Sequence, residues 1–301
     1  TQLPDGLSQL PFLEFIQINH APAIKRIGPE FIQSYHHHSH RPSQMLPAFP
    51  RLHEMNLIGM VEWEEWEWEE QVEAMPHLDE LFLCNCRLRR VPLGLASNAK
   101  ALKKLIIQDI QHLSYLENFP LILTLLGSPD LERITNFPNL QKLTITDCPK
   151  LNVLESVPAL NMLVLEDYTM EELPEYLRDI KPRHLQLFCR LWLLSAVAAG
   201  QSGTEWDKFS QVEHVKAYAC DGDNQRKWYV LYTRGDNCKL DSNISSSSIF
   251  EGTENQTYKL CLNLFEQSDS ACLYGSLILS PAFRPYILHD DRIYSVPSRF
   301  S

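Results

Sequence analysis

The sequence has no apolar run that approaches the roughly eighteen residues a membrane-spanning helix requires, and its longest such run lies near 191–199. It also has no excess of basic residues, since 38 acidic side chains outnumber 27 basic ones and give a formal net charge of −11. A surface that binds phosphates needs a stripe of positive side chains, and none is visible. We therefore expect no integral membrane segment and no nucleic-acid partner, and we expect an acidic chain of this kind to bind other proteins.

The chain also lacks a targeting segment at its start, which reads Thr1-Gln2-Leu3-Pro4 without an initiating Met. Its first residues already belong to a leucine pattern that repeats along the chain, which suggests a fragment of a longer protein. Eight Cys in a chain of this length without a secretory signal do not indicate a disulfide framework. We expect buried thiols in a reducing, cytoplasmic environment, Cys86 and Cys148 among them.

What the sequence does contain is a recurring Leu-x-x-Leu-x-Leu pattern. Its clear copies stand at 13–18, 52–57, 78–83, 102–107, 140–145 and 160–165, with degenerate copies near 123–125 and 185–187. The last apolar residues of these copies are Ile18, Leu57, Leu83, Ile107, Leu125, Ile145, Leu165 and Leu187. A unit of this size buries its apolar side only against its neighbours. The fold class that follows is α/β, a leucine-rich-repeat solenoid whose curved parallel β-sheet has an irregular or short-helical outer face and a C-terminal capping region.

Within each copy the leucines are expected to point inward, so that Leu81, Leu105, Leu143 and Leu163 form one buried row. The residues between them point outward and form the inner curve, which is where solenoids usually bind their partners. We therefore select these outward residues as candidates for protein binding: Glu80, Phe82, Lys104, Ile106, Gln108, Lys142, Thr144, Thr146, Met162, Val164 and Glu166.

The spacing of the leucines divides the chain into three regions. The solenoid occupies 1–192, and 19–48 within it is an irregular insertion or a degenerate repeat. Residues 193–250 form a C-terminal cap, with a short helix at 192–199 and a strand in "KWYVLYTR". The aromatic residues expected to seal the end of the core are Trp192, Trp206, Phe209, Trp228 and Tyr229. Residues 251–301 are an unassigned tail and a candidate for disorder.

Two clusters raise the alternative of an enzyme. The segment 61–73, "VEWEEWEWEEQVE", mixes Trp with carboxylates as a glycosidase would, but it also suits aromatic packing with solvated Glu. The His-rich segment 36–40 supplies metal-binding imidazoles but sits among Ser, Pro and Gln, without the fixed geometry of a natural site. Neither cluster brings together a base, an acid or nucleophile and an orienting group. We expect no enzymatic activity, no catalytic residue and no metal site.

Several long strings resemble a known family. "MVEWEEWEWEEQVEAMPHLDELFLCNCRLRRVPLGLA", "SPDLERITNFPNLQKLTITDCPKL", "PEYLRDIKPRHLQLFCRLWLL" and "GTEWDKFSQVEHVKAYACDGDNQRKWYVLYTR" are similar to the C-terminal leucine-rich region of cereal coiled-coil nucleotide-binding leucine-rich-repeat (NLR) disease-resistance proteins. The resemblance covers roughly residues 1–250. The strings "EWDKF" and "RKWYVLYTR" are specific to this family rather than to leucine-rich repeats in general.

The resemblance implies an intracellular plant immune receptor that senses pathogens. In that family an upstream nucleotide-binding domain exchanges ADP for ATP, while the leucine-rich region restrains this switch and takes part in recognition. The implied partners are the receptor's own nucleotide-binding domain and a pathogen effector or guarded host protein. No Gly-x-x-x-x-Gly-Lys-Ser/Thr phosphate loop occurs in this sequence, so we expect no cofactor here. The alternative is a leucine-rich-repeat substrate adaptor of a ubiquitin ligase.

Overall fold

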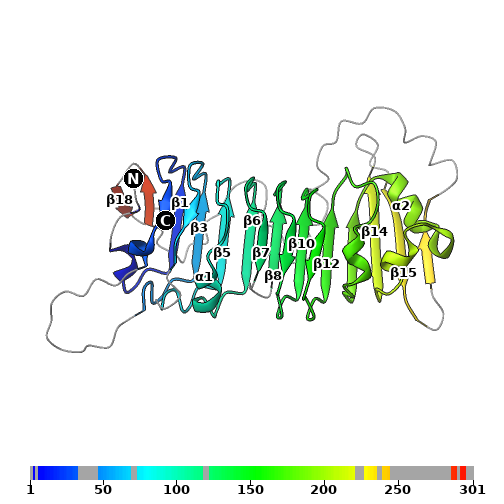
Figure 1. The fold of residues 1–301 in the computed structure, drawn as a ribbon, viewed down its shortest axis with the longest axis horizontal. Helices are drawn as coiled ribbons and strands as arrows, with labels where there is room; N and C mark the ends of the chain where they lie inside the picture. The colour runs from blue at the N-terminus through cyan, green and yellow to red at the C-terminus, as the bar shows by residue number, and fades with distance from the viewer. Residues whose placement is uncertain are drawn as a thin grey trace, which may run out of the picture.

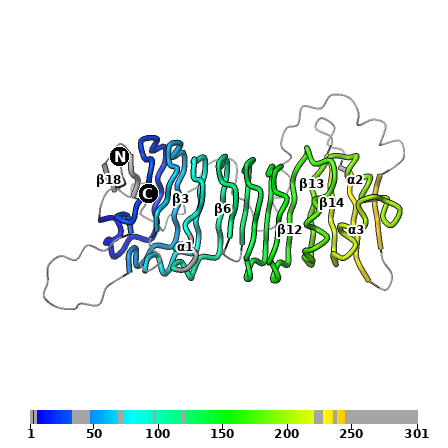
Figure 2. The backbone as a smooth tube through the Cα atoms, viewed as in Figure 1, coloured from blue at the N-terminus to red at the C-terminus, as the bar shows by residue number. Residues whose placement is uncertain are grey.

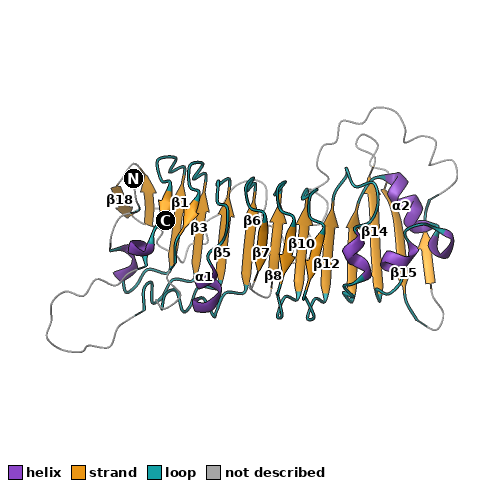
Figure 3. Ribbon diagram, in the orientation of Figure 1, coloured by secondary structure: helices purple, strands orange, loops and turns teal. Residues whose placement is uncertain are grey.

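The computed structural model describes residues 3, 6–32, 47–68, 73–117, 122–220, 227–235 and 239–244, together with two strands at 286–289 and 292–295. These residues form a solenoid of parallel strands with few helices (Figures 1 and 3). Its main layer is a 13-stranded sheet whose strands lie side by side along the longest axis of the molecule (Figure 1). The backbone winds in successive coils from the end that holds residues 6–32 to the end that holds residues 227–235 and 239–244 (Figure 2).

Most strands of the main sheet pair in parallel and in chain order. They are β1 (Phe15–Asn19), β3 (Glu54–Ile58), β5 (Glu80–Cys84), β6 (Lys104–Gln108), β8 (Ile122–Leu126), β10 (Lys142–Thr146), β12 (Met162–Glu166), β13 (His184–Phe188) and β14 (His214–Cys220). Beyond β14 the sheet continues in antiparallel fashion through β15 (Lys227–Thr233) and β16 (Lys239–Ser242). At the opposite edge, β17 (Tyr286–His289) pairs in parallel with β1, and β18 (Arg292–Ser295) pairs antiparallel with β17.

Alternate residues of the parallel strands form the core. Leu81, Leu105, Leu143 and Leu163 lie in one cross-strand row, with Leu123 of β8 in the same row. Each of these side chains is at most 1% exposed, so the buried row expected from the sequence is confirmed. The period of two in a strand sends the neighbouring residues to the other side of the sheet.

A second buried row runs parallel to the first. It consists of Ile18, Leu57, Leu83, Ile107, Leu125, Ile145, Leu165 and Leu187, in register from strand to strand. These are the residues that mark the repeats in the sequence. The row continues into β14 with Ala217, a small residue that the leucine pattern does not flag.

The turn after each strand of the first six coils has a left-handed residue. The backbone angle φ is positive at His20, Gly59, Asn85, Asp109, Gly127 and Asp147. Each of these residues donates its N–H to the next strand, as Asp109 does to the Leu126 carbonyl at 2.8 Å. Gly, Asn and Asp adopt this conformation at the lowest energetic cost, which explains why one of them follows most of these strands.

The outer side of the solenoid is more regular than the sequence predicts. Short strands pair in parallel there: β7 (Tyr115–Glu117), β9 (Arg133–Thr135) and β11 (Val153–Glu155) in one group, and β2 (Arg26–Ile27) with β4 (Glu65–Trp66) in another. Units of about twenty residues leave little chain for a return helix. The central side chains Leu116, Ile134 and Leu154 are at most 1% exposed and close the core from this side.

Helical turns fill the remaining outer positions. They are η1 (Leu7–Gln9), η2 (Pro29–Phe31), α1 (Leu93–Asn98), η3 (Glu175–Arg178), α2 (Leu191–Ala198), η4 (Gly200–Ser202) and α3 (Trp206–Phe209). In the described part of the chain, no helix has both the length and the apolar character needed to cross a membrane.

At the C-terminal end, aromatic rings pack edge to face behind the sheet. Trp206, Phe209 and Tyr232 lie with ring centroids 5.4 to 5.6 Å apart, and Phe209 is fully buried. Trp192 does not join them, because it is 43% exposed on α2. The prediction that Trp192 seals the core is therefore wrong. Its neighbours Leu193 and Leu194 occupy the buried side of α2 instead.

Candidate protein-binding surface

The outward residues of the parallel strands form three rows across the exposed face of the sheet. From β5 to β12 the first row reads Glu80, Lys104, Ile122, Lys142 and Met162. The middle row reads Phe82, Ile106, Thr124, Thr144 and Val164. The third row reads Cys84, Gln108, Leu126, Thr146 and Glu166. Strand alternation and register therefore present these side chains on one continuous surface.

The centre of this surface is apolar. Phe82, Ile106 and Val164 share the middle row, and Ile122 and Met162 lie in the row beside it. All five side chains are half-buried by their neighbours on the sheet and retain a solvent-facing side. We call these five residues the apolar band. Lys142 and Thr144 of β10 stand between Met162 and Val164 on one side and the other three residues on the other, so the band consists of two apolar patches. Apolar patches rimmed by polar residues are typical of protein-interaction sites.

The eleven residues selected from the sequence all lie on the outward side of β5, β6, β10 and β12. Ten of them are half-buried or exposed. Thr146 is the exception: it is only 7% exposed and offers almost no contact area. It stands in register between the longer side chains of Leu126 and Glu166 on the adjacent strands, so Thr146 is removed from the candidate set.

Two parts of the surface were not selected as candidates from the sequence. The strand β8 places Ile122, Thr124 and Leu126 in the middle of the face, although its leucine pattern is degenerate. Farther along, Phe188 of β13 and Tyr218 of β14 stack with ring centroids 5.6 Å apart. The alternation in "HVKAYAC" is the signal that identifies β14, but its inward residues are Val and Ala rather than Leu.

Charged residues lie at both ends of the strands that carry the apolar band. Where the strands begin, Lys104 pairs with Glu80 at 3.3 Å. Where they end, Asp147, Glu166 and Asp167 lie close together. Burial raises the pKa of Glu166, and the charge of Asp147 adds to this effect, while a hydrogen bond from Tyr168 opposes it. Burial and the charge of Asp167 likewise raise the pKa of Asp147. The end of the strands is thus an acidic margin.

A pair of stacked imidazoles extends the first row onto β13 and β14. The rings of His184 and His214 lie 5.1 Å apart with an interplanar angle of 12°. Burial lowers the pKa of His184, and the nearby His214, Arg183 and Lys216 lower it further, while Glu213 opposes the shift.

This lowered pKa predicts a pH dependence of stability. Since the folded protein holds the His184 proton less tightly than the unfolded chain does, its contribution is complete above the ordinary His pKa of about 6.5 and is lost as the pH falls below it. We expect the free energy of unfolding to decrease on acidification through this window. Urea unfolding at several pH values, compared with the His184→Gln variant, measures it. An equal pH slope in both proteins would exclude His184 as the source.

The Trp-rich segment packs into the core instead of lining a site. Trp63, Trp66 and Trp68 are at most 9% exposed, so their faces are not open to a sugar. Two of the carboxylates between them form surface ion pairs, Glu64 with Arg89 at 2.9 Å and Glu67 with Arg26 at 3.5 Å. The segment closes the outer side of the solenoid through β4. Glu69 and Glu70 lie outside the described residues.

The His-rich segment 36–40 also lies outside the described residues. Within the residues that are described, no group of three or more His, Cys, Asp or Glu side chains has the arrangement of a metal site. Five cysteines are described, and each is a free thiol. Burial raises the pKa of Cys86 and of Cys148 to about 11. These two thiols stay protonated at neutral pH and belong to the core.

No protein-family model matches the chain, and searches of curated proteins and of solved structures also found no match. The geometry therefore supports a parallel-strand repeat solenoid with a broad exposed sheet face, an architecture typical of protein-interaction domains.

Proposed function

We propose that the chain is the protein-binding and autoinhibitory leucine-rich-repeat region of an intracellular plant immune receptor. The observation that carries this proposal is the apolar band, which lies on one face of a parallel sheet whose strands pair in a fixed register. The family-like strings support the choice of receptor class, because "EWDKF" and "RKWYVLYTR" coincide with the elements that close the C-terminal end of the sheet, α3 and β15.

Physical arguments favour proteins over small molecules as ligands of this face. The band extends from β5 to β12 across a sheet whose neighbouring strands are spaced by roughly 4.8 Å, so that it offers a wide, rigid surface. A rigid, half-buried apolar surface costs little conformational entropy on binding. Its charged margins would fix the orientation of a partner more than they would add affinity.

The leucine-rich-repeat identity rests on the buried rows and on the turn chemistry. Cys86 donates to the Cys84 carbonyl at 3.2 Å, and Cys148 donates to the Thr146 carbonyl at 3.4 Å. Both thiols thus satisfy backbone groups at the turn after a strand, as Asn or Cys does in such repeats. We place the elements after β13 as the cap of the solenoid. Reduced core thiols fit a cytoplasmic location.

In this proposal the face restrains the nucleotide-binding domain of the receptor and participates in recognition of an effector or a guarded host protein. ADP and ATP would be held by that domain and not by this chain.

A substitution in the apolar band tests the proposal. The Ile106→Arg/Val164→Arg variant, co-expressed with the nucleotide-binding portion of a coiled-coil disease-resistance protein, is expected to associate at least about tenfold more weakly, because it places two charges in a desolvated interface. Co-precipitation and cell-death assays measure association and restraint. The matched control is Glu155→Arg, which puts the same residue on the outer strand β11.

Retained association in the double variant would contradict a role for the apolar band. If the chain itself neither associates with the nucleotide-binding portion nor restrains cell death, the autoinhibitory proposal fails. Capture of a ubiquitin-ligase core subunit instead would favour the adaptor alternative.

A further inference from the structure

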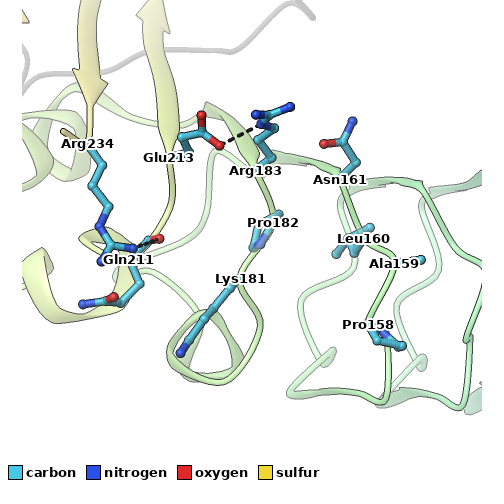
Figure 4. Close-up of a pocket in the computed structure, with 10 residues that line it drawn as sticks. All are labelled: Pro158, Ala159, Leu160, Asn161, Lys181, Pro182, Arg183, Gln211, Glu213 and Arg234. Carbon is cyan, nitrogen blue, oxygen red and sulfur yellow. Dashed lines mark hydrogen bonds and ion pairs between the residues drawn. The ribbon is translucent and has the colours of Figure 1, made fainter.

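A cavity of about 590 Å³ lies at the margin of the sheet where β12, β13 and β14 begin. Figure 4 shows its three sides. The turn 158–161 lies on one side, and Gln211, Glu213 and Arg234 lie on the other. The segment 181–183 runs between them into β13. The cavity therefore draws on the ends of four neighbouring strands, β12 to β15.

Backbone hydrogen bonds fix these four strand ends relative to one another. The His184 N–H donates to the Asn161 carbonyl at 2.8 Å, and the His214 N–H donates to the Arg183 carbonyl at 2.9 Å. The Arg234 N–H completes the series with the Glu213 carbonyl at 2.8 Å. Because the sheet ladder continues through these residues, the cavity is a preformed feature of the fold.

Most charged side chains in the cavity are basic, although the formal net charge of the chain is −11. Lys181, Arg183 and Arg234 line it, and Glu213 is its one acidic residue. Glu213 is engaged by Arg183, whose Nε lies 2.7 Å from a Glu213 carboxylate oxygen. Arg234 donates to the Gln211 carbonyl at 3.1 Å. Among the described residues, no ion pair joins Lys181 or Arg234 to a carboxylate.

The extent of the cavity decides which anion fits. Four neighbouring strands are separated by three spacings of roughly 4.8 Å, or about 14 Å in all. The cations lie at two of these strands, Lys181 and Arg183 before β13 and Arg234 after β15, and are therefore spread over two spacings, or about 10 Å. A single small anion cannot span that distance. An extended peptide segment with two or more carboxylates can, and the amide side chains of Asn161 and Gln211 supply further polar contacts along it.

We propose that this cavity is a docking site for an acidic segment of a protein partner. The carboxylates of the segment pair with Lys181 and Arg234, and they compete with Glu213 for Arg183. The site adjoins the exposed sheet face, because Arg183 and Glu213 directly precede the stacked His184 and His214. The inference takes from the proposed function only that the chain binds proteins, and its residues are separate from the apolar band.

A labelled hexaglutamate peptide tests the site by fluorescence anisotropy with the full chain at low salt. We expect the Lys181→Glu/Arg234→Glu variant to bind at least about tenfold more weakly, since two attractive contacts become repulsive. The Lys100→Glu/Lys103→Glu variant is the matched control, because it changes the net charge equally at exposed lysines outside the cavity. It is expected to bind like the parent chain.

We expect a third variant to bind the peptide more tightly than the parent chain. Glu213→Gln removes the internal competitor for Arg183 and is expected to bind the peptide about two- to fivefold more tightly, the range that corresponds to one exposed ion pair. A structural role for Glu213 alone would produce no gain. Circular dichroism and thermal unfolding confirm that each variant remains folded.

Three results would overturn the site. The first is no peptide binding by the parent chain, and the second is equal weakening in both double variants, which indicates non-specific attraction. The third is displacement of the peptide by inorganic phosphate beyond that by chloride at matched ionic strength, which indicates a free-anion site. Because the Ile106→Arg/Val164→Arg assay uses other residues, a failure here leaves that test intact.

Discussion

The Leu143→Ala variant is expected to lose about 2–5 kcal/mol of its free energy of unfolding. Leu143 is fully buried in the core row between Leu123 and Leu163. The parallel ladder fixes β10 against a neighbour on each side, so the strands cannot close over the space that the lost methyl groups leave. The cost therefore includes a cavity as well as the lost transfer free energy. Urea denaturation followed by far-ultraviolet circular dichroism measures it.

The neighbouring residue supplies the control. Thr144→Ala changes the next position of the same strand, but its side chain lies on the outward side and is half-buried. We expect a change within about 1 kcal/mol, the scale of a single cross-strand pair. If both substitutions cost the same, the inward and outward assignment of β10 would be wrong. A broadened transition for Leu143→Ala would instead show that the coils unfold separately.

The main sheet can be predicted from the sequence because the leucine positions reflect a single physical requirement. Each unit must bury an apolar side against its neighbours, so residues such as Leu83 and Leu165 recur and align in register. At the ends of the solenoid, burial no longer requires leucine. In β14 the inward residues include Val215 and Ala217, which are as buried as the leucines of the other strands but break the pattern. The sheet therefore extends beyond residue 192, where the leucine spacing ends.

The candidate surface is predictable only in part. Strand alternation alone places Phe82 and Val164 on the outward side, and the register between strands brings them into one row. The exposure of Thr146 depends on the size of its neighbours across the strands, which alternation does not reveal. The cationic cavity cannot be predicted from the sequence at all. Lys181 and Arg234 lie far apart in the sequence, and only the coiling of the backbone brings the two strand ends together.

The Lys208→Met variant is expected to destabilise the protein by about 3–5 kcal/mol. Lys208 is 3% exposed, and its ammonium donates to the Leu173 carbonyl at 2.7 Å. It also lies 3.0 Å from Glu175 and 3.4 Å from Glu205. Glu205, itself 5% exposed, accepts a hydrogen bond from the Leu173 N–H at 2.8 Å. The Glu and Lys of "EWDKF" thus fasten α3 to the loop before η3.

Burial by itself lowers the pKa of Lys208, but hydrogen bonds to Glu175 and Glu172 and the charge of Glu205 together raise it above its ordinary value. The ammonium is therefore charged at neutral pH, and its contribution is lost only as the pH rises through the folded pKa. Met keeps the length and apolar stem of the side chain but not its charge. The substitution leaves the Glu205 carboxylate buried without a cation, and this unpaired charge is the source of the large cost.

Lys150→Met is the matched control for this effect. Lys150 makes an even shorter ion pair, 2.7 Å to Asp130, but both side chains are exposed to solvent. Water and salt screen such a pair, so we expect a loss of no more than about 1 kcal/mol. Thermal unfolding of both variants at neutral pH separates the two cases. A Lys208→Met variant as stable as Lys150→Met would mean that Glu205 does not need a cation beside it, and the "EWDKF" segment would then hold α3 through Trp206 and Phe209 alone.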